Sequence, residues 1–333
     1  MTSSFANFKI DVHTHPVPEF YREALVDAGY SARNLSDVFV DGFRTPNFDI
    51  KSYVDERVEH GYGFSVLSIT APGVSFLHGS YRAEELARQL NQEMQSYRKA
   101  YPDQIGAFCI LPLPDIQSSL EEIKYCLDEL KFEGVGLYTN YDGVYLGDAQ
   151  LDPILEELDR RGCPVLVHPT NPQRAPTLTG VSLPVIEYPF DTTRAITNLL
   201  WVRARERFPN IKLIFSHGGG ALPFLADRLG VQTTLPFHGG REYADSMKEL
   251  RSYYYDTAVV FGAPQIAALK EFVGADRILT GSDFPYVPRA MVPMGLNAFN
   301  EFVGFTPEEK LKIDYRNAME LFPSLREKFP NLN

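Results

Sequence analysis

The chain has 333 residues, of which 44% are hydrophobic, and it carries a formal net charge of −11 at pH 7. This length fits one large domain with a sizeable core. The negative charge argues against nucleic acid or an anionic membrane surface as the main partner, although a local pocket can still be cationic. We see no secretory signal and no apolar run that could span a bilayer. The few, widely spaced cysteines, Cys109, Cys126 and Cys163, predict reduced thiols in a cytoplasmic protein.

Short apolar, β-branched runs alternate with amphipathic helical stretches along the whole chain. In chain order, eight runs lie at 9–15, 64–70, 104–112, 132–139, 164–169, 212–219, 252–258 and 277–285. Strand-like runs that alternate with helices indicate parallel βαβ units and therefore an α/β fold. The count of eight favours a (β/α)8 TIM barrel over a doubly wound sheet, and no glycine-rich phosphate-binding turn follows the first run.

No linker divides the chain, so we expect residues 1–333 to form a single barrel domain. Longer connections follow the first, second and fifth runs, at 16–50, 71–80 and 170–190. In a barrel these connections lie at the carboxyl ends of the strands, where active sites are built. We therefore expect these three loops to surround the functional site.

Polar residues stand at the ends of several predicted strands. In the stretch DVHTH, His13 and His15 are two positions apart, so both side chains should point to one side of the strand. His168, His217 and Asp283 end the fifth, sixth and eighth runs. A single histidine at such a place is usually a core residue with a hydrogen-bond partner, but this coincidence favours a shared metal pocket. His13, His15, His168 and Asp283 would offer three nitrogens and one oxygen to a divalent ion.

Four segments together resemble the amidohydrolase superfamily. They read DVHTH (11–15), VHP (167–169), FSHGGGALPFLADR (215–228) and TGSDFP (280–285). The resemblance covers nearly the whole chain. It is closest to the metal-dependent nonoxidative decarboxylases, which include aminocarboxymuconate semialdehyde decarboxylase and the decarboxylases of o-hydroxybenzoates such as 6-methylsalicylate and γ-resorcylate. Because both histidines of the first motif are present, the chain resembles the methylsalicylate and muconate-semialdehyde types more than the others.

The resemblance implies that His13, His15, His168 and Asp283 bind one divalent metal ion. Zinc suits this ligand set best, and manganese is the alternative because the expected substrate chelates through oxygen. Binuclear members of the superfamily carry a lysine at the end of the fourth strand. The fourth run of this chain, FEGVGLYT, has no lysine, so the resemblance implies a mononuclear site.

Further roles follow from the resemblance. Asp283 or His217 would donate the proton in the reaction, and the sequence does not choose between them. Arg228 would reach into the neighbouring subunit's active site, which implies a homodimer or a dimer of dimers.

Substrate contacts are expected from three more residues. Arg44, in the first long loop, is a candidate for binding the substrate carboxylate, or else a solvated arginine. Phe190 and Phe284 would line a flat apolar pocket for the ring of a small aromatic carboxylate, or else belong to the core.

The predicted reaction is the decarboxylation of an aromatic o-hydroxy acid, 6-methylsalicylate or a close analogue, to CO2 and a phenol. Protonation of the carboxylate-bearing carbon would precede loss of CO2, with the metal orienting the carboxylate and the ortho oxygen. Two enzymatic alternatives stay open: a metal-dependent hydrolase of a lactone or amide, and a decarboxylase of an aminocarboxymuconate semialdehyde-type substrate. A barrel that keeps metal only for stability is disfavoured, because a structural site has no use for the extra base His217.

Overall fold

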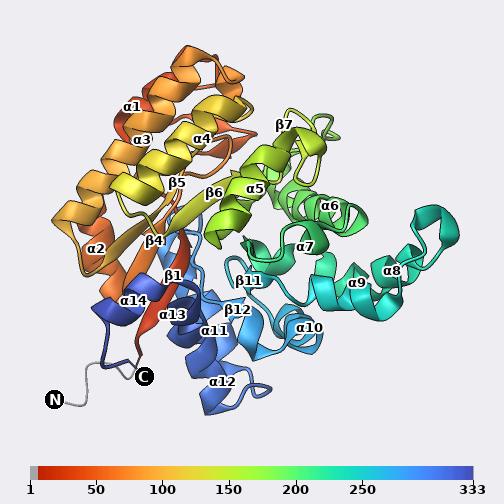
Figure 1. Ribbon diagram of the computed structural model, residues 1–333. Helices are drawn as coiled ribbons and strands as arrows, with labels where there is room; N and C mark the ends of the chain where they lie inside the picture. Colours follow the sequence, from red (N-terminus) through yellow and green to blue (C-terminus); the bar gives the residue numbers. More distant parts are fainter. Residues whose placement is uncertain (1–6, 333) are drawn as a thin grey trace.

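The computed structural model describes residues 7–332 and contains a sheet of eight parallel strands with helices around it (Figure 1). Along the sheet, the strands are β1 (Lys9–Thr14), β4 (Tyr62–Leu67), β5 (Ile105–Cys109), β6 (Gly134–Tyr138), β9 (Pro164–His168), β10 (Lys212–Phe215), β11 (Tyr254–Asp256) and β12 (Ile278–Leu279). The last strand returns to the first, because Val12 N–H donates to the Thr280 carbonyl at 3.0 Å. The predicted (β/α)8 barrel is confirmed.

Helices fill the connections between successive strands. The longer ones are α2 (Ile50–Glu59), α3 (Tyr81–Ala100), α4 (Ile116–Lys124), α5 (Asp152–Arg161), α6 (Glu187–Trp201), α8 (Leu222–Thr233), α9 (Tyr243–Leu250), α10 (Ala263–Val273) and α11 (Val292–Glu301). The sequence explains α5 well. Its leucines at helical spacing bury Leu155 and Leu158 against the barrel, and Gly162 ends it in the left-handed conformation at φ 60°.

The interior of the barrel is filled with apolar side chains at its amino-terminal end. Strand residues such as Ile10, Phe64 and Phe108 form one buried cluster with Phe322 and Leu325. The last two belong to the C-terminal segment that carries α13 (Asn317–Leu321) and α14 (Pro323–Lys328), which lies beside β1 in Figure 1. The barrel is therefore closed at this end, and space for a ligand lies at the carboxyl ends of the strands.

The loops at that end carry more regular structure than the sequence indicated. The segment 16–50 contains α1 (Glu19–Asp27) and a hairpin of β2 (Phe39–Val40) and β3 (Phe43–Arg44). The helix forms because Tyr21 and Leu25 are four residues apart and both are buried, which gives it an apolar face. Among residues 7–332, no helix combines the length and apolar character needed to cross a membrane.

Candidate metal centre

The predicted site residues from four strands meet at the carboxyl end of the barrel. Single nitrogen or oxygen atoms of His13, His168, His217 and Asp283 all lie within 4.8 Å of one another. His15 adjoins this group, with its Nε2 3.0 Å from His13 Nε2 and 3.3 Å from the Asp283 Oδ1 atom. The five side chains, which are up to 270 positions apart in the sequence, thus form one cluster as expected.

Three of the imidazoles present an unprotonated nitrogen to the centre of the cluster. The Nδ1 atoms face oxygen acceptors: His13 with Asp256 Oδ2 at 2.7 Å, His15 with the Ser68 carbonyl at 2.9 Å, and His168 with the Pro169 carbonyl at 2.7 Å. A carbonyl or carboxylate oxygen only accepts, so Nδ1 carries the hydrogen of a neutral ring, and the lone pair of that neutral ring is then on Nε2. Two lone pairs 3.0 Å apart repel unless a cation lies between them. The donor set therefore fits a divalent metal ion.

The charges of the cluster also favour a cation. Burial lowers the pKa of His13, but the charges and hydrogen bonds of Asp256 and Asp283 outweigh burial and raise that pKa to about 10. Burial raises the pKa of Asp283, yet hydrogen bonds from the surrounding histidines hold it well below its usual range. Burial and the neighbouring imidazoles hold the pKa of His168 far below its ordinary value. The two carboxylates thus attract positive charge, which a metal ion supplies better than a proton shared among crowded imidazoles.

Asp256 connects two members of the cluster. Its Oδ2 atom binds His13, and its Oδ1 atom accepts the backbone N–H of His217 at 2.8 Å. This carboxylate is completely buried, so it has no competing water. A carboxylate behind a metal-binding histidine fixes the tautomer and raises the basicity of the other nitrogen.

His217 differs from the other histidines of the cluster. It follows β10 in the left-handed conformation, at φ 56°, and its buried Nδ1 atom has no hydrogen-bond partner among the described residues. Its Nε2 atom lies 3.5 Å from Asp283 Oδ2. The segment after His217 packs closely against α6. Gly220 lies so near the Pro189 carbonyl that a Cβ at this position would be 2.0 Å from that oxygen. With Nε2 beside the Asp283 carboxylate and no partner for Nδ1 among the described residues, His217 is suited to exchange a proton with Asp283.

Two tyrosine rings form the walls of the cluster. Tyr286 meets the ring of His15 edge to face at 5.7 Å, and Tyr188 meets His168 at 5.8 Å. Burial raises the pKa of both phenols, so both are neutral hydrogen-bond donors at ordinary pH. Tyr286 was not predicted, although it stands only three residues beyond Asp283 in the segment 280–286.

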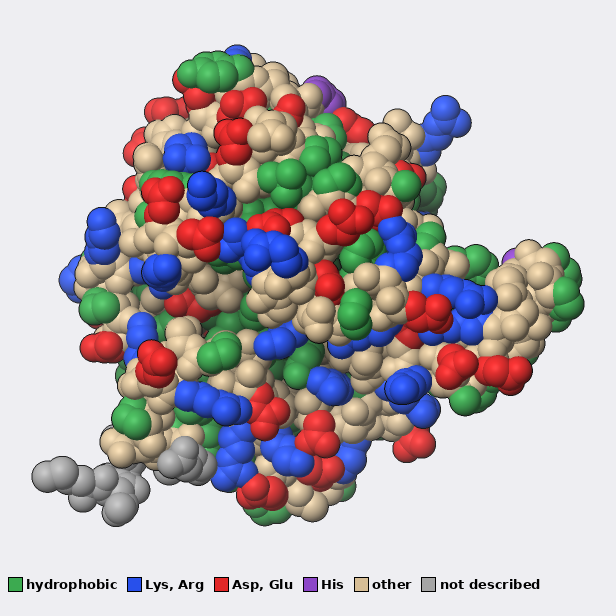
Figure 2. Space-filling model, viewed as in Figure 1, with side chains coloured by type: hydrophobic (Ala, Val, Ile, Leu, Met, Phe, Trp, Pro, Cys, Tyr) green, Lys and Arg blue, Asp and Glu red, His purple; other side chains and the backbone are tan. Residues whose placement is uncertain are grey.

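The predicted substrate contacts lie away from the cluster within one chain. Arg44 is exposed and forms an ion pair with Asp37. Phe190 is 42% exposed on α6, and the partly buried Phe284 stacks on Tyr53 with ring centroids 5.0 Å apart. Arg228 is exposed on α8, which projects from the barrel as an arm (Figures 1 and 2). The roles of these four residues therefore stay predictions.

A cavity of about 460 Å³ lies at the mouth of the barrel, in the loops that follow β1, β4, β6 and β9. Its polar lining includes Asp41, His78, Asn140, Asp142 and Asn171. Burial raises the pKa of Asp41. None of the described residues that line this cavity is a lysine or arginine, so one chain offers a substrate carboxylate no side-chain cation here.

Comparison with known proteins agrees with this architecture. The family model described as Amidohydrolase matches residues 10–324. The chain is 34% identical to a 6-methylsalicylic acid decarboxylase from Penicillium expansum, with 96% of this chain and 97% of that protein covered. A solved structure named as an amidohydrolase II superposes with a TM-score of 0.86 at 29% identity, covering 95% and 99% of the two chains. A dihydroxybenzoic acid decarboxylase from Polaromonas sp., solved with bound manganese, has the same fold, with a TM-score of 0.79 at 22% identity over 97% and 99%. This chain belongs to the amidohydrolase family.

Proposed function

We propose that this protein is a metal-dependent nonoxidative decarboxylase that converts an aromatic o-hydroxy acid, 6-methylsalicylate or a close analogue, to CO2 and a phenol. One observation carries the proposal. Three buried imidazoles, whose Nδ1 atoms are held by oxygen acceptors, gather beside the Asp283 carboxylate at the open end of the barrel. The 34% identity to the 6-methylsalicylic acid decarboxylase, over 96% of this chain, supports the substrate class.

His13, His15, His168 and Asp283 would hold one divalent ion, which supplies positive charge for the substrate carboxylate and its ortho oxygen. Zinc is our first choice for three nitrogens and one oxygen, with manganese as the alternative. The manganese bound in the Polaromonas decarboxylase supports the alternative, although that protein is only 22% identical. We also propose a cytoplasmic location, because Cys109, Cys126 and Cys163 are all free thiols.

Side chains of the protein would supply the proton that the reaction needs. Decarboxylation requires a proton on the ring carbon that bears the carboxylate. The carbon–carbon bond then breaks, and its electron pair restores the aromatic ring. Because its low pKa keeps Asp283 ionised, Asp283 would first take a proton from His217, whose Nε2 lies 3.5 Å from Asp283 Oδ2, and would then deliver that proton to the ring. The neighbouring rings of Tyr188 and Tyr286 would confine the flat substrate between them.

The function is tested by incubating the metal-loaded protein with 6-methylsalicylate. We expect one CO2 and one 3-methylphenol for each substrate consumed, and in D2O one deuterium at the carbon that carried the carboxylate. A deuterium label at that carbon shows that a solvent-derived proton replaces the carboxylate, which the hydrolysis of a lactone does not do. Failure to release CO2 from any o-hydroxybenzoate, combined with opening of a lactone, would replace this proposal by the hydrolase.

We further propose a homodimer, or a dimer of dimers, in which Arg228 completes the neighbouring site. Among the described residues that line the mouth cavity, none is a lysine or arginine. Arg228 stands on an arm that also exposes Phe224 (89%), Val231 (53%) and Phe237 (77%), and such an apolar group is costly unless another surface covers it. A second copy of the chain would bury these side chains and bring the guanidinium to the substrate carboxylate.

Subunit complementation tests this arrangement. Arg228→Ala and Asp283→Asn should each be inactive alone, because the first lacks the cation and the second a metal ligand. When the two variants are refolded or co-expressed together, mixed dimers should regain activity, since the Arg228→Ala subunit keeps its metal and receives Arg228 from its partner. Decarboxylation rates of the purified mixed dimers provide the measurement. Mixed dimers without activity would show that Arg228 does not act across an interface.

A further inference from the structure

Asp11 joins two segments that both carry proposed metal ligands. It is completely buried in β1. Its Oδ1 atom accepts the backbone N–H groups of His13 and Ser282, each at 3.0 Å, and its Oδ2 atom accepts the Ser282 hydroxyl at 2.6 Å. Two of the three bonds of this buried carboxylate thus go to the segment between β12 and Asp283, and the third goes to His13 in β1. The decarboxylation steps described above use neither Asp11 nor Ser282.

This link lies where the barrel closes. β12 is only two residues long, so residues 280–284 run beside β1 without a regular ladder. Asp283 is in the left-handed conformation at φ 58°, which costs free energy for a residue other than glycine and persists only where neighbouring bonds hold it. One such bond runs from Asp283 N–H to the His13 carbonyl at 2.8 Å. The hydroxyl of Ser282 also accepts Phe284 N–H at 3.1 Å, so it fixes the residues on both sides of Asp283.

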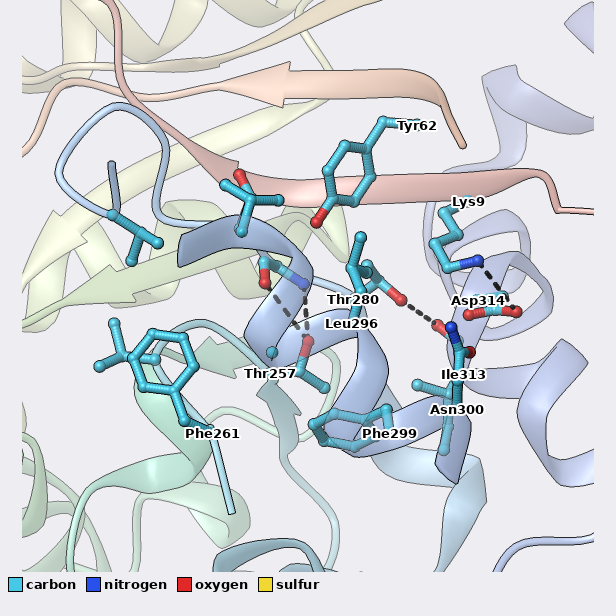
Figure 3. Close-up of a pocket in the computed structure, with 16 residues that line it drawn as sticks. Lys9, Tyr62, Thr257, Phe261, Thr280, Leu296, Phe299, Asn300, Ile313 and Asp314 are labelled. Atoms are coloured by element: carbon cyan, nitrogen blue, oxygen red, sulfur yellow. Dashed lines mark hydrogen bonds and ion pairs between the residues drawn. The ribbon is translucent and has the colours of Figure 1, made fainter. Parts of the chain in front are cut away.

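Packing alone does not hold this segment. A small cavity of about 30 Å³ borders Gly281 and Ser282, and Figure 3 shows it between Tyr62, Thr257, Phe299 and the other residues around it. Its volume suits a water molecule or two and no substrate. Because atoms beside a void lose contacts, the position of the segment depends on directional bonds. One of these runs from Gly281 N–H to the Thr257 hydroxyl at 3.0 Å, and others join the segment to Asp11 and to the His13 carbonyl.

We propose that Asp11 and Ser282 form a positioning clamp that sets the Asp283 carboxylate at ligand distance from His13 and His15. The two histidines come from β1, whereas Asp283 comes from the irregular end of β12. The clamp joins these elements, and Asp283 Oδ1 then lies 3.5 Å and 3.3 Å from the two Nε2 atoms. The clamp acts through Asp283, so its two residues are positioning residues. This inference rests on the proposed metal centre but not on the identity of the substrate.

The test compares metal affinity among three variants. Ser282→Ala removes the hydroxyl bonds to Asp11, Phe284 and the His13 carbonyl. We expect its affinity for Zn²⁺ and Mn²⁺, measured by competition with a chelator, to fall about 10–100-fold. Ser282→Thr keeps the hydroxyl and should restore affinity to within about threefold. Ser246→Ala is the matched control, because Ser246 is equally buried and its hydroxyl binds Thr233 Oγ1 at 2.7 Å on α8 and α9, outside the metal centre. Cobalt(II) absorption spectra of the loaded variants should change for Ser282→Ala alone.

The outcomes separate this inference from the proposed function. Unchanged metal affinity and cobalt spectrum in Ser282→Ala would overturn the clamp, as would an equal loss of affinity in Ser246→Ala. A wild-type protein that binds no divalent ion would overturn both the clamp and the metal centre. A wild-type protein that binds metal but leaves o-hydroxybenzoates intact would overturn only the proposed reaction, while a selective loss of affinity in Ser282→Ala would still support the clamp. Melting temperatures of the metal-free proteins show whether Ser282→Ala costs more stability than Ser246→Ala.

Discussion

Asp283→Asn should lower kcat/KM for 6-methylsalicylate by about 10⁴-fold, because this carboxylate is both a proposed metal ligand and the proposed proton donor. An asparagine has nearly the same shape but carries no negative charge and cannot protonate the ring. The substitution adds little backbone strain, since asparagine tolerates the left-handed conformation that Asp283 adopts at φ 58°. The loss of activity in Asp283→Asn should therefore result from the missing carboxylate and not from a distorted backbone. Steady-state kinetics at saturating metal, together with the metal content of the purified variant, provide the measurement.

Asp142→Asn is a matched control for this experiment. Asp142 is also left-handed, at φ 51°, and it lines the mouth cavity without belonging to the metal cluster. We expect this control to retain metal and to keep kcat/KM within about threefold of wild type, since an exposed carboxylate contributes little to a buried site. If Asp283→Asn kept full metal content and more than a tenth of the activity, Asp283 would be neither a necessary ligand nor the proton donor.

The strands and the convergence of the site could be predicted from the sequence because both follow from periodic rules. His13 lies within a regular strand and His15 directly after it, so the alternation of side chains along a strand predicted the 3.0 Å approach of their Nε2 atoms. His217 and Asp283 were placed correctly at strand ends, but their side-chain directions could not be predicted. Both leave the strand in the left-handed conformation, at φ 56° and 58°, where no alternation applies.

The loop residues were harder to predict, since their contacts depend on tertiary packing. Arg44 was a candidate for the substrate carboxylate or else a solvated arginine, and the hairpin of β2 and β3 places it beside Asp37. The ring of Phe284 follows Asp283 directly and yet stacks on Tyr53, because the turn at Asp283 directs the two neighbouring side chains to different sides. The hydrogen bonds of Asp11 gave no sequence signal at all, as a buried aspartate beside a histidine motif has no pattern of its own. Sequence rules thus locate the metal centre, while its supporting bonds are visible only in three dimensions.

His217→Asn should lower kcat by about 10²–10⁴-fold while leaving the metal content unchanged, because we assign His217 to proton transfer and not to metal binding. Asparagine again suits the backbone, which is left-handed at φ 56°. His78→Asn is the matched control: His78 is left-handed at φ 51° and lines the mouth cavity, where it pairs with Asp142 at 2.9 Å. This control should keep both metal and activity.

The same variant decides which histidines hold the ion. His217 lies within 4.8 Å of the atoms of His13, His168 and Asp283, so the geometry alone would also allow it as a ligand in place of His15. The contacts of the Nδ1 atoms favour His15 over His217 as the metal ligand. The Nδ1 of His15 is fixed by the Ser68 carbonyl, whereas the Nδ1 of His217 has no partner among the described residues. A ligand needs a fixed tautomer, and a proton carrier benefits from a free one. Loss of metal from His217→Asn, with metal retained in His15→Asn, would reverse the two assignments and leave Asp283 without its proton partner.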